Sequence, residues 1–114
     1  MTDSKTYDVS GAKVSITANT YPTTIDLHIT VNLHDLDKDE PDHSAHNLIN
    51  YLNLPGYKTA STYWWEAAHR SITCKTASQA RRIVRNTLIK IDDAVSAALL
   101  ARSTRKNDGK QILI

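Results

Sequence analysis

The chain has 114 residues, of which 40% are hydrophobic and 23% charged, with three glycines and three prolines. This length argues for a single domain over residues 1–114, and the composition excludes collagen-like, disordered and low-complexity classes. The formal net charge of +2 conceals an asymmetry, because residues 1–66 carry 9 acidic and 4 basic residues while residues 67–114 carry 3 acidic and 10 basic ones. The chain is therefore acidic in its first part and basic in its second.

Two further observations limit the class of protein. No apolar run approaches the roughly 20 residues of a membrane-spanning helix, and the first residues lack the hydrophobic core of a signal peptide, so we expect a cytoplasmic protein without a membrane partner. The single cysteine, Cys74, cannot form an intramolecular disulfide. Its position in an alternating segment predicts a buried structural residue rather than a nucleophile.

The first 36 residues have the alternation of a β-hairpin. Val14, Ile16 and Ala18 alternate with polar neighbours, and the pattern resumes from Ile25 to Leu33 after a break at 19–22. One face of the second strand is wholly polar, so we expect that face to lie in water or on a partner. Its residues are Asp26, His28, Thr30, Asn32 and His34.

Asp26 and His28 could form an acid–base pair on that face. Chance pairs of this kind are common on a wet strand face, and the sequence has neither a Gly-x-Ser-x-Gly turn nor a glycine-rich phosphate loop. We therefore expect no enzymatic activity and no catalytic residues.

Residues 35–42 hold five acids, one base and a proline, which predicts a solvated connection. Asp42 or Ser44 would then cap a short helix that runs to about Asn53 and ends at residues 54–56, Leu-Pro-Gly.

The same region is a candidate metal site because seven possible ligands fall within 13 residues: His34, Asp35, Asp37, Asp39, Asp42, His43 and His46. The run imitates an EF-hand loop, but Glu40 and Pro41 replace its glycine turn and His46 replaces its bidentate glutamate. A solvated acidic loop is the better interpretation, and we expect neither a metal nor a cofactor.

Residues 57–75 leave two alternatives open. Residues 62–65 and 71–75 have the β-branched and aromatic content of a strand pair, whereas residues 65–70 also suit a helix. We favour the strand pair.

The last part of the chain predicts a long amphipathic helix. Thr76 and Gln79 form a capping box, and an apolar stripe of helical spacing follows at Ala80, Val84, Leu88, Ile91, Val95 and Ala98. We expect about 25 helical residues packed on the sheet, and a basic tail over 103–114 that frays. The predicted fold class is α+β: an N-terminal hairpin, a short helix, a second strand pair and this long helix.

A basic cluster is the strongest functional signal. Between residues 70 and 90 there are six bases and no acid, and they should project from the outer side of the helix and the preceding strand. With two neighbouring tryptophans able to anchor an interface, they make up the predicted partner-binding set: Arg70, Lys75, Arg81, Arg82, Arg85, Lys90, Trp64 and Trp65.

Two functional hypotheses follow. The first is a non-catalytic binding protein, comparable to the small inhibitors of phages and mobile elements, that occupies an acidic or phosphate-lined groove of a protein or ribonucleoprotein complex. The second is a module that binds RNA or DNA directly through phosphates. The long helix also permits a homodimer.

Overall fold

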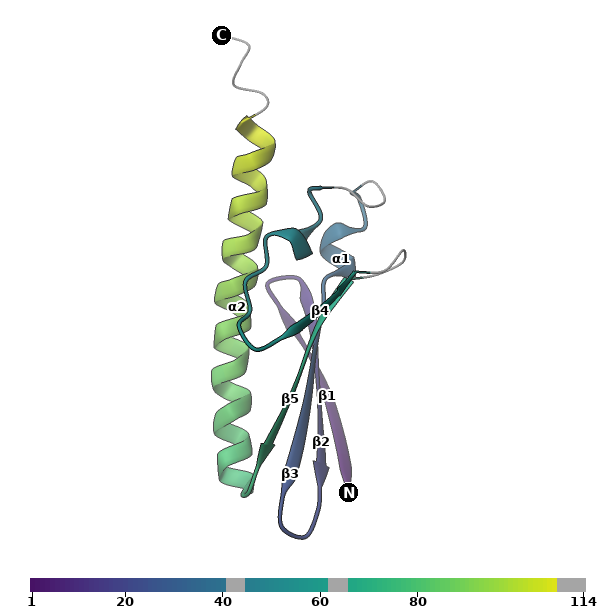
Figure 1. Ribbon diagram of the computed structural model, residues 1–114, viewed down its shortest axis with the longest axis vertical. Helices are drawn as coiled ribbons and strands as arrows, with labels where there is room; N and C mark the ends of the chain where they lie inside the picture. Colours follow the sequence, from purple (N-terminus) through teal and green to yellow (C-terminus); the bar gives the residue numbers. More distant parts are fainter. Residues whose placement is uncertain (41–44, 62–65, 109–114) are drawn as a thin grey trace.

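The computed structural model describes residues 1–40, 45–61 and 66–108 (Figure 1). Five strands form one antiparallel sheet in the order β1-β2-β3-β5-β4, and α2 runs along one face of it (Figure 1). This is the predicted α+β architecture. In chain order the elements are β1 (Thr2–Val9), β2 (Ala12–Thr20), β3 (Ile25–Asn32), α1 (His34–Asp37), the 3-10 turn η1 (Leu48–Asn50), β4 (Lys58–Ser61), β5 (Glu66–Cys74) and α2 (Ala77–Asp108).

The predicted hairpin is confirmed as β2 and β3, with Ile16 opposite Ile29. A strand that the sequence did not indicate, β1, pairs with β2 at the edge of the sheet. Its residues alternate poorly because an edge strand contributes little to the core. Ser10 and Gly11 join β1 to β2 with φ values of 53° and 92°, the left-handed backbone that a two-residue hairpin turn requires.

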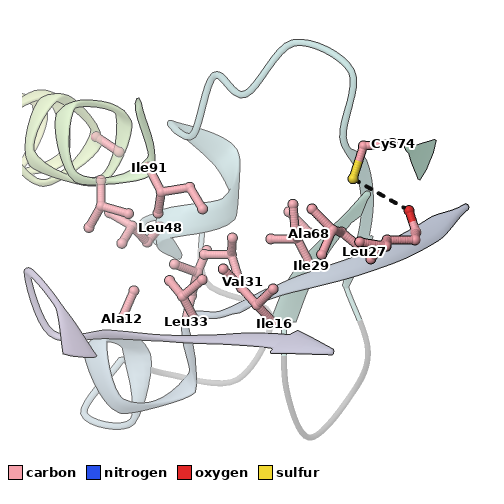
Figure 2. Packing of buried hydrophobic residues seen from close by; sticks show 14 residues of the cluster. Ala12, Ile16, Leu27, Ile29, Val31, Leu33, Leu48, Ala68, Cys74 and Ile91 are labelled. Atoms are coloured by element: carbon pink, nitrogen blue, oxygen red, sulfur yellow. Dashed lines mark hydrogen bonds between the residues drawn. The ribbon is translucent and has the colours of Figure 1, made fainter. Parts of the chain in front are cut away.

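The core lies between the sheet and the middle of α2 (Figure 2). Ile91 of α2 and Leu48 of η1 are fully buried and meet Val31 and Leu33 from the end of β3 (Figure 2). Cys74 is buried, as expected, and its thiol donates to the carbonyl of Ile25 at 3.6 Å. The apolar positions of β2 and β3 therefore all point to one face, where α2 covers them.

The opposite face of the sheet carries cross-strand pairs of polar side chains. They join Thr2 to Asn19 (2.8 Å), Ser4 to Thr17 (2.8 Å), Thr6 to Ser15 (3.3 Å), Asp26 to Thr73 (2.9 Å), His28 to Ser71 (2.9 Å) and Thr30 to His69 (3.3 Å). Asp26 and His28 each bond to a hydroxyl of β5 and not to one another. His34 lies outside this face because β3 ends at Asn32 and His34 begins α1.

The segment after β3 differs from its prediction. The sequence predicts a solvated connection and a helix reaching Asn53, but residues 34–37 form α1, and within residues 45–53 the helical part is the 3-10 turn Leu48–Asn50. The physical reason is Asp37, whose carboxylate accepts the backbone N–H of Leu48 at 3.0 Å. That N–H is then not available for the hydrogen bond that it would make within a helix starting near residue 44. The proposed caps Asp42 and Ser44 lie outside the described residues.

Asp37 also forms an ion pair with Arg102 of α2 in which the two side chains are only 10% and 12% exposed. The guanidinium of Arg102 additionally donates to the carbonyl of Leu36 at 3.3 Å. This acidic segment is thus partly a buried contact with α2 and not simply a solvated linker.

A strand pair within residues 57–75 is confirmed, and it consists of β4 and β5. The sequence predicts its first strand at residues 62–65, which lie outside the described residues, whereas β4 occupies Lys58–Ser61. Residues 66–70 belong to β5 and not to a helix, and alternate residues Ala68, Ile72 and Cys74 face the helix side of the sheet. Residues 62–65, with Trp64 and Trp65, lie outside the described part of the chain.

The start of α2 is the predicted capping box. The Thr76 hydroxyl accepts the N–H of Gln79 at 3.1 Å, and the Gln79 side chain accepts the N–H of Lys75 at 3.0 Å. The helix has 32 residues, so residues 103–108 of the predicted fraying tail are helical, and residues 109–114 lie outside the described residues. Among the described residues, no helix is both long and apolar enough to cross a membrane.

Candidate functional site

The six predicted basic residues are all exposed. Within residues 1–40, 45–61 and 66–108, none of them takes part in an ion pair, because the two pairs present join Lys13 to Asp8 and Arg102 to Asp37. Their charges are therefore directed to solvent, to a partner or to a ligand. The two predicted aromatic anchors, Trp64 and Trp65, cannot be placed beside them because they fall outside the described residues.

The structure divides these cations by their position around α2. Arg82 and Arg85 lie on the side away from the sheet, since the buried positions of the helix are Thr87, Ile91, Val95 and Ala98. Arg81 lies on one flank, where it borders an apolar hollow of about 480 Å³ beside β1. We call Arg81, Arg82 and Arg85 the basic ridge. Lys75 lies in the turn just before α2.

The remaining two cations, Arg70 and Lys90, line a cavity on the other flank of α2. This β5–α2 cavity, about 480 Å³ in volume and open to solvent on one side, is lined by residues of β5, the first half of α2 and the 54–57 segment. Its lining is apolar apart from these cations and three polar side chains, those of Tyr57, Asn86 and Thr87. The apolar lining residues are Leu54, Pro55, Ile72 and Ile83. No carboxylate belongs to it among the described residues.

Arg70 enters this cavity because of its strand position. It lies opposite Ile29 of β3, so its side chain leaves the sheet on the helix side, between those of Ala68 and Ile72. Its guanidinium carbon lies 5.7 Å from the centre of the Tyr57 ring, a cation–π arrangement. Burial raises the pKa of the Tyr57 hydroxyl, and the charge of Arg70 partly opposes that rise.

Gly56 makes the approach of Arg70 possible. Its φ is +86°, so Gly56 has the left-handed backbone predicted at residues 54–56, although η1 ends at Asn50 and the expected helix does not reach Asn53. A Cβ atom at this position would lie 3.2 Å from the guanidinium carbon of Arg70, closer than most side-chain contacts. The glycine thus leaves room for the guanidinium against the turn.

Thr87 is the polar residue of the cavity that sequence analysis missed. It is 7% exposed and is the buried polar residue of the described core. Its hydroxyl makes no side-chain hydrogen bond with the described residues, although a buried hydroxyl normally has a partner. A signal was present in the sequence, because Thr87 lies three residues after Val84 and four before Ile91 and so shares the helical face of the apolar stripe.

Two of the candidate metal ligands, Asp37 and His46, form contacts with other side chains or backbone groups. Asp37 is bonded to Arg102 and Leu48, and the ring of His46 lies 3.4 Å from the Tyr51 hydroxyl. Over the described ranges, no group of three or more histidine, cysteine, aspartate or glutamate side chains is placed to hold a metal ion. Asp42 and His43 lie outside those ranges.

The first half of α2 thus presents two chemically different surfaces. The basic ridge offers cations to an extended surface, whereas the β5–α2 cavity offers two cations, a ring and a hydroxyl without a hydrogen-bond partner among the described residues, in a concave and largely apolar space. Comparison with models of protein families, with curated proteins and with solved structures finds no match to this chain.

Proposed function

We propose that this protein is a non-catalytic binding protein of the inhibitor type, which attaches to an acidic or phosphate-lined surface of a macromolecular partner. The observation that carries the proposal is the basic ridge: Arg81, Arg82 and Arg85 are exposed and have no acidic partner among the described residues. Exposed cations of this kind favour binding to a negatively charged surface and raise the rate of association with it.

The position of the ridge also supports the proposal. Helix N-termini favour acidic residues, yet the first turn of α2 contains none, and the bases follow at once. Local helix stability does not account for this arrangement, whereas binding of an anionic partner does. The polar face of the sheet adds little competing charge, since most of its side chains are hydroxyls, amides and imidazoles bonded to one another.

The test is affinity capture from the native cell with the wild-type protein and with Arg82→Glu/Arg85→Glu. The expected result is loss of specific partners from the variant. A matched control, Lys38→Glu/Lys58→Glu, makes the same charge change at two exposed lysines outside the ridge and should retain them. If the ridge variant retains every partner of the wild type, the ridge is not the binding surface.

The unbroken run of bases from residue 70 to 90 also favours a second candidate function, direct binding of RNA or DNA. Titration against generic duplex and single-stranded nucleic acid at two salt concentrations separates the two. Direct binding predicts an affinity that falls steeply with salt, with the log–log slope reduced by about one for each phosphate contact removed. Absence of binding at low salt would eliminate this candidate.

A further inference from the structure

The structure assigns to the β5–α2 cavity a second binding site, for a small organic phosphate that carries a flat ring, of the size of a nucleoside monophosphate. This site is separate from the basic ridge and goes beyond the macromolecular binding proposed above. Four properties of the cavity carry the inference: its volume, its charge, its apolar walls and the hydroxyl of Thr87.

The volume and charge define the ligand's size and sign. About 480 Å³ lies within the range of roughly 300–1,000 Å³ typical of small-molecule sites. Arg70 and Lys90 both line the cavity, and neither is paired with a carboxylate among the described residues. Two cations without a counter-charge match a dianion, and guanidinium and ammonium groups are the usual ligands of phosphate.

The walls define the rest of the ligand. Leu54, Ile72 and Ile83 are apolar, and the partly buried Tyr57 ring lies beside the Arg70 guanidinium. A phosphate alone would leave these apolar surfaces in contact with water. A flat ring attached to the phosphate covers them and stacks on aromatic or guanidinium planes, as nucleobases do.

Thr87 supplies the independent evidence that a polar ligand atom belongs in the cavity. Its side chain is more than nine-tenths buried, lines the cavity and has no hydrogen-bond partner in the described part of the chain. A buried unpaired hydroxyl is costly, and natural proteins retain one where a ligand or ordered water completes it. Asn86, one residue earlier on α2, adds an exposed amide to the same wall.

The inference is tested by isothermal titration calorimetry of the full chain with AMP, GMP, CMP and UMP, each up to about 1 mM, and with inorganic phosphate and adenosine as partial ligands. At least one nucleotide should bind with 1:1 stoichiometry, at least tenfold more tightly than either partial ligand. If no nucleotide binds, or if inorganic phosphate binds as tightly as the best nucleotide, the inference is overturned.

Three variants locate the bound nucleotide. Arg70→Gln and Lys90→Gln should each weaken binding more than about tenfold, because each removes a charge-assisted contact. Thr87→Val keeps the shape of the side chain and should weaken binding by about two- to tenfold through loss of one hydrogen bond. Circular dichroism confirms that each variant is folded, and unchanged affinity in all three overturns the assignment.

A fourth variant separates this inference from the proposed function. Arg82→Gln/Arg85→Gln alters the basic ridge without touching the cavity and should leave nucleotide affinity within twofold of wild type. An equal loss in this variant would mean that the nucleotide binds through general surface charge, and the cavity assignment would fail. Failure of the macromolecular capture experiment alone would leave the nucleotide result unaffected.

Discussion

The two parts of α2 before and after residue 90 carry the same apolar stripe but pack differently, and we call residues 77–90 its first half and residues 91–108 its second half. In the second half Ile91, Val95 and Ala98 are at most 1% exposed, whereas Ile83 and Leu88 in the first half are only partly buried. The difference comes from what surrounds the helix. The second half is covered by η1 and held by the Arg102–Asp37 ion pair, while the first half has a hollow on each flank.

This contrast shows how stability and binding are separated along a single helix. The second half packs its apolar stripe against the core and contacts η1, and its Arg102 holds Asp37 of α1. The first half is less covered and carries Lys90 and the basic ridge. Regions with few buried contacts are those that proteins use for binding and for motion.

The largest expected effect comes from removing the anchor of the second half. Asp37→Ala removes the carboxylate that accepts from the guanidinium of Arg102 and from the N–H of Leu48. The side chains of Asp37 and Arg102 are only 10% and 12% exposed, so the guanidinium would be left nearly buried without its counter-charge. We expect a loss of about 3–5 kcal/mol in the free energy of unfolding, measured by urea denaturation. The matched control Asp35→Ala, an exposed residue of the same short helix, should change it by less than about 0.5 kcal/mol.

Two isoleucine-to-alanine substitutions, one in each half of α2, compare how much the two halves contribute to the free energy of unfolding. Ile91→Ala should lower the free energy of unfolding by about 2–5 kcal/mol, because a fully buried side chain leaves a cavity. Ile83→Ala, at a partly buried position beside an existing hollow, should cost about 1 kcal/mol. Equal losses in denaturant unfolding would contradict the difference between the two halves.

A smaller effect is expected at the wall of the β5–α2 cavity. Gly56→Ala forces a non-glycine residue into the left-handed region and presses a methyl group against Arg70, at a cost of about 1–2 kcal/mol. It should also weaken nucleotide binding because Arg70 must shift. Asn53→Ala, an exposed change in the same loop, is the control and should alter neither thermal stability nor affinity.

Thr87→Val is expected to change stability in the opposite direction. It removes a buried hydroxyl that has no partner in the described chain, so the free energy of unfolding should rise by roughly 1 kcal/mol in the absence of ligand. Differential scanning calorimetry with and without nucleotide measures both effects. A loss of stability on this substitution would mean that the hydroxyl is already satisfied.

The smallest effect concerns pH at the β1–β2 turn, beside the second half of α2. The Lys13 ammonium, 2.7 Å from the Asp8 carboxylate, and the Gly11 N–H lower the pKa of Asp8. A lowered folded-state pKa gives stability that is present above the unfolded pKa and lost as the pH falls through the folded one. NMR titration should show the pKa of Asp8 returning toward its usual value in Lys13→Gln and unchanged in Lys38→Gln.

Much of this fold follows from periodicity, and the exceptions have physical causes. β2, β3 and the start of α2 were predictable because their apolar residues face one core and their caps are local. The region before η1 was not, because it depends on Arg102, 65 positions away from Asp37 in the chain. No local pattern contains a pairing of that kind.

The candidate site was predictable only in part. The run of bases was visible in the sequence, but its division between an outer ridge and a cavity depends on the direction in which Arg70 leaves β5. If residues 66–74 are read as a strand, their alternation places Arg70 on the same side as Ala68, Ile72 and Cys74. The sequence also allowed a helix over residues 65–70, so the direction of the Arg70 side chain could not be predicted. The contribution of Tyr57 required the tertiary arrangement of the turn beside β5.

The paired polar side chains on the open face of the sheet have a consequence for folding fidelity. A shift of one residue between neighbouring strands would turn the apolar set away from the core, and a shift of two would also mismatch partners such as Ser4 with Thr17 and His28 with Ser71. Correct alignment is thus favoured on both faces of the sheet. The three-stranded meander β1-β2-β3, whose contacts are local in sequence, can therefore select its alignment before α2 arrives to cover it.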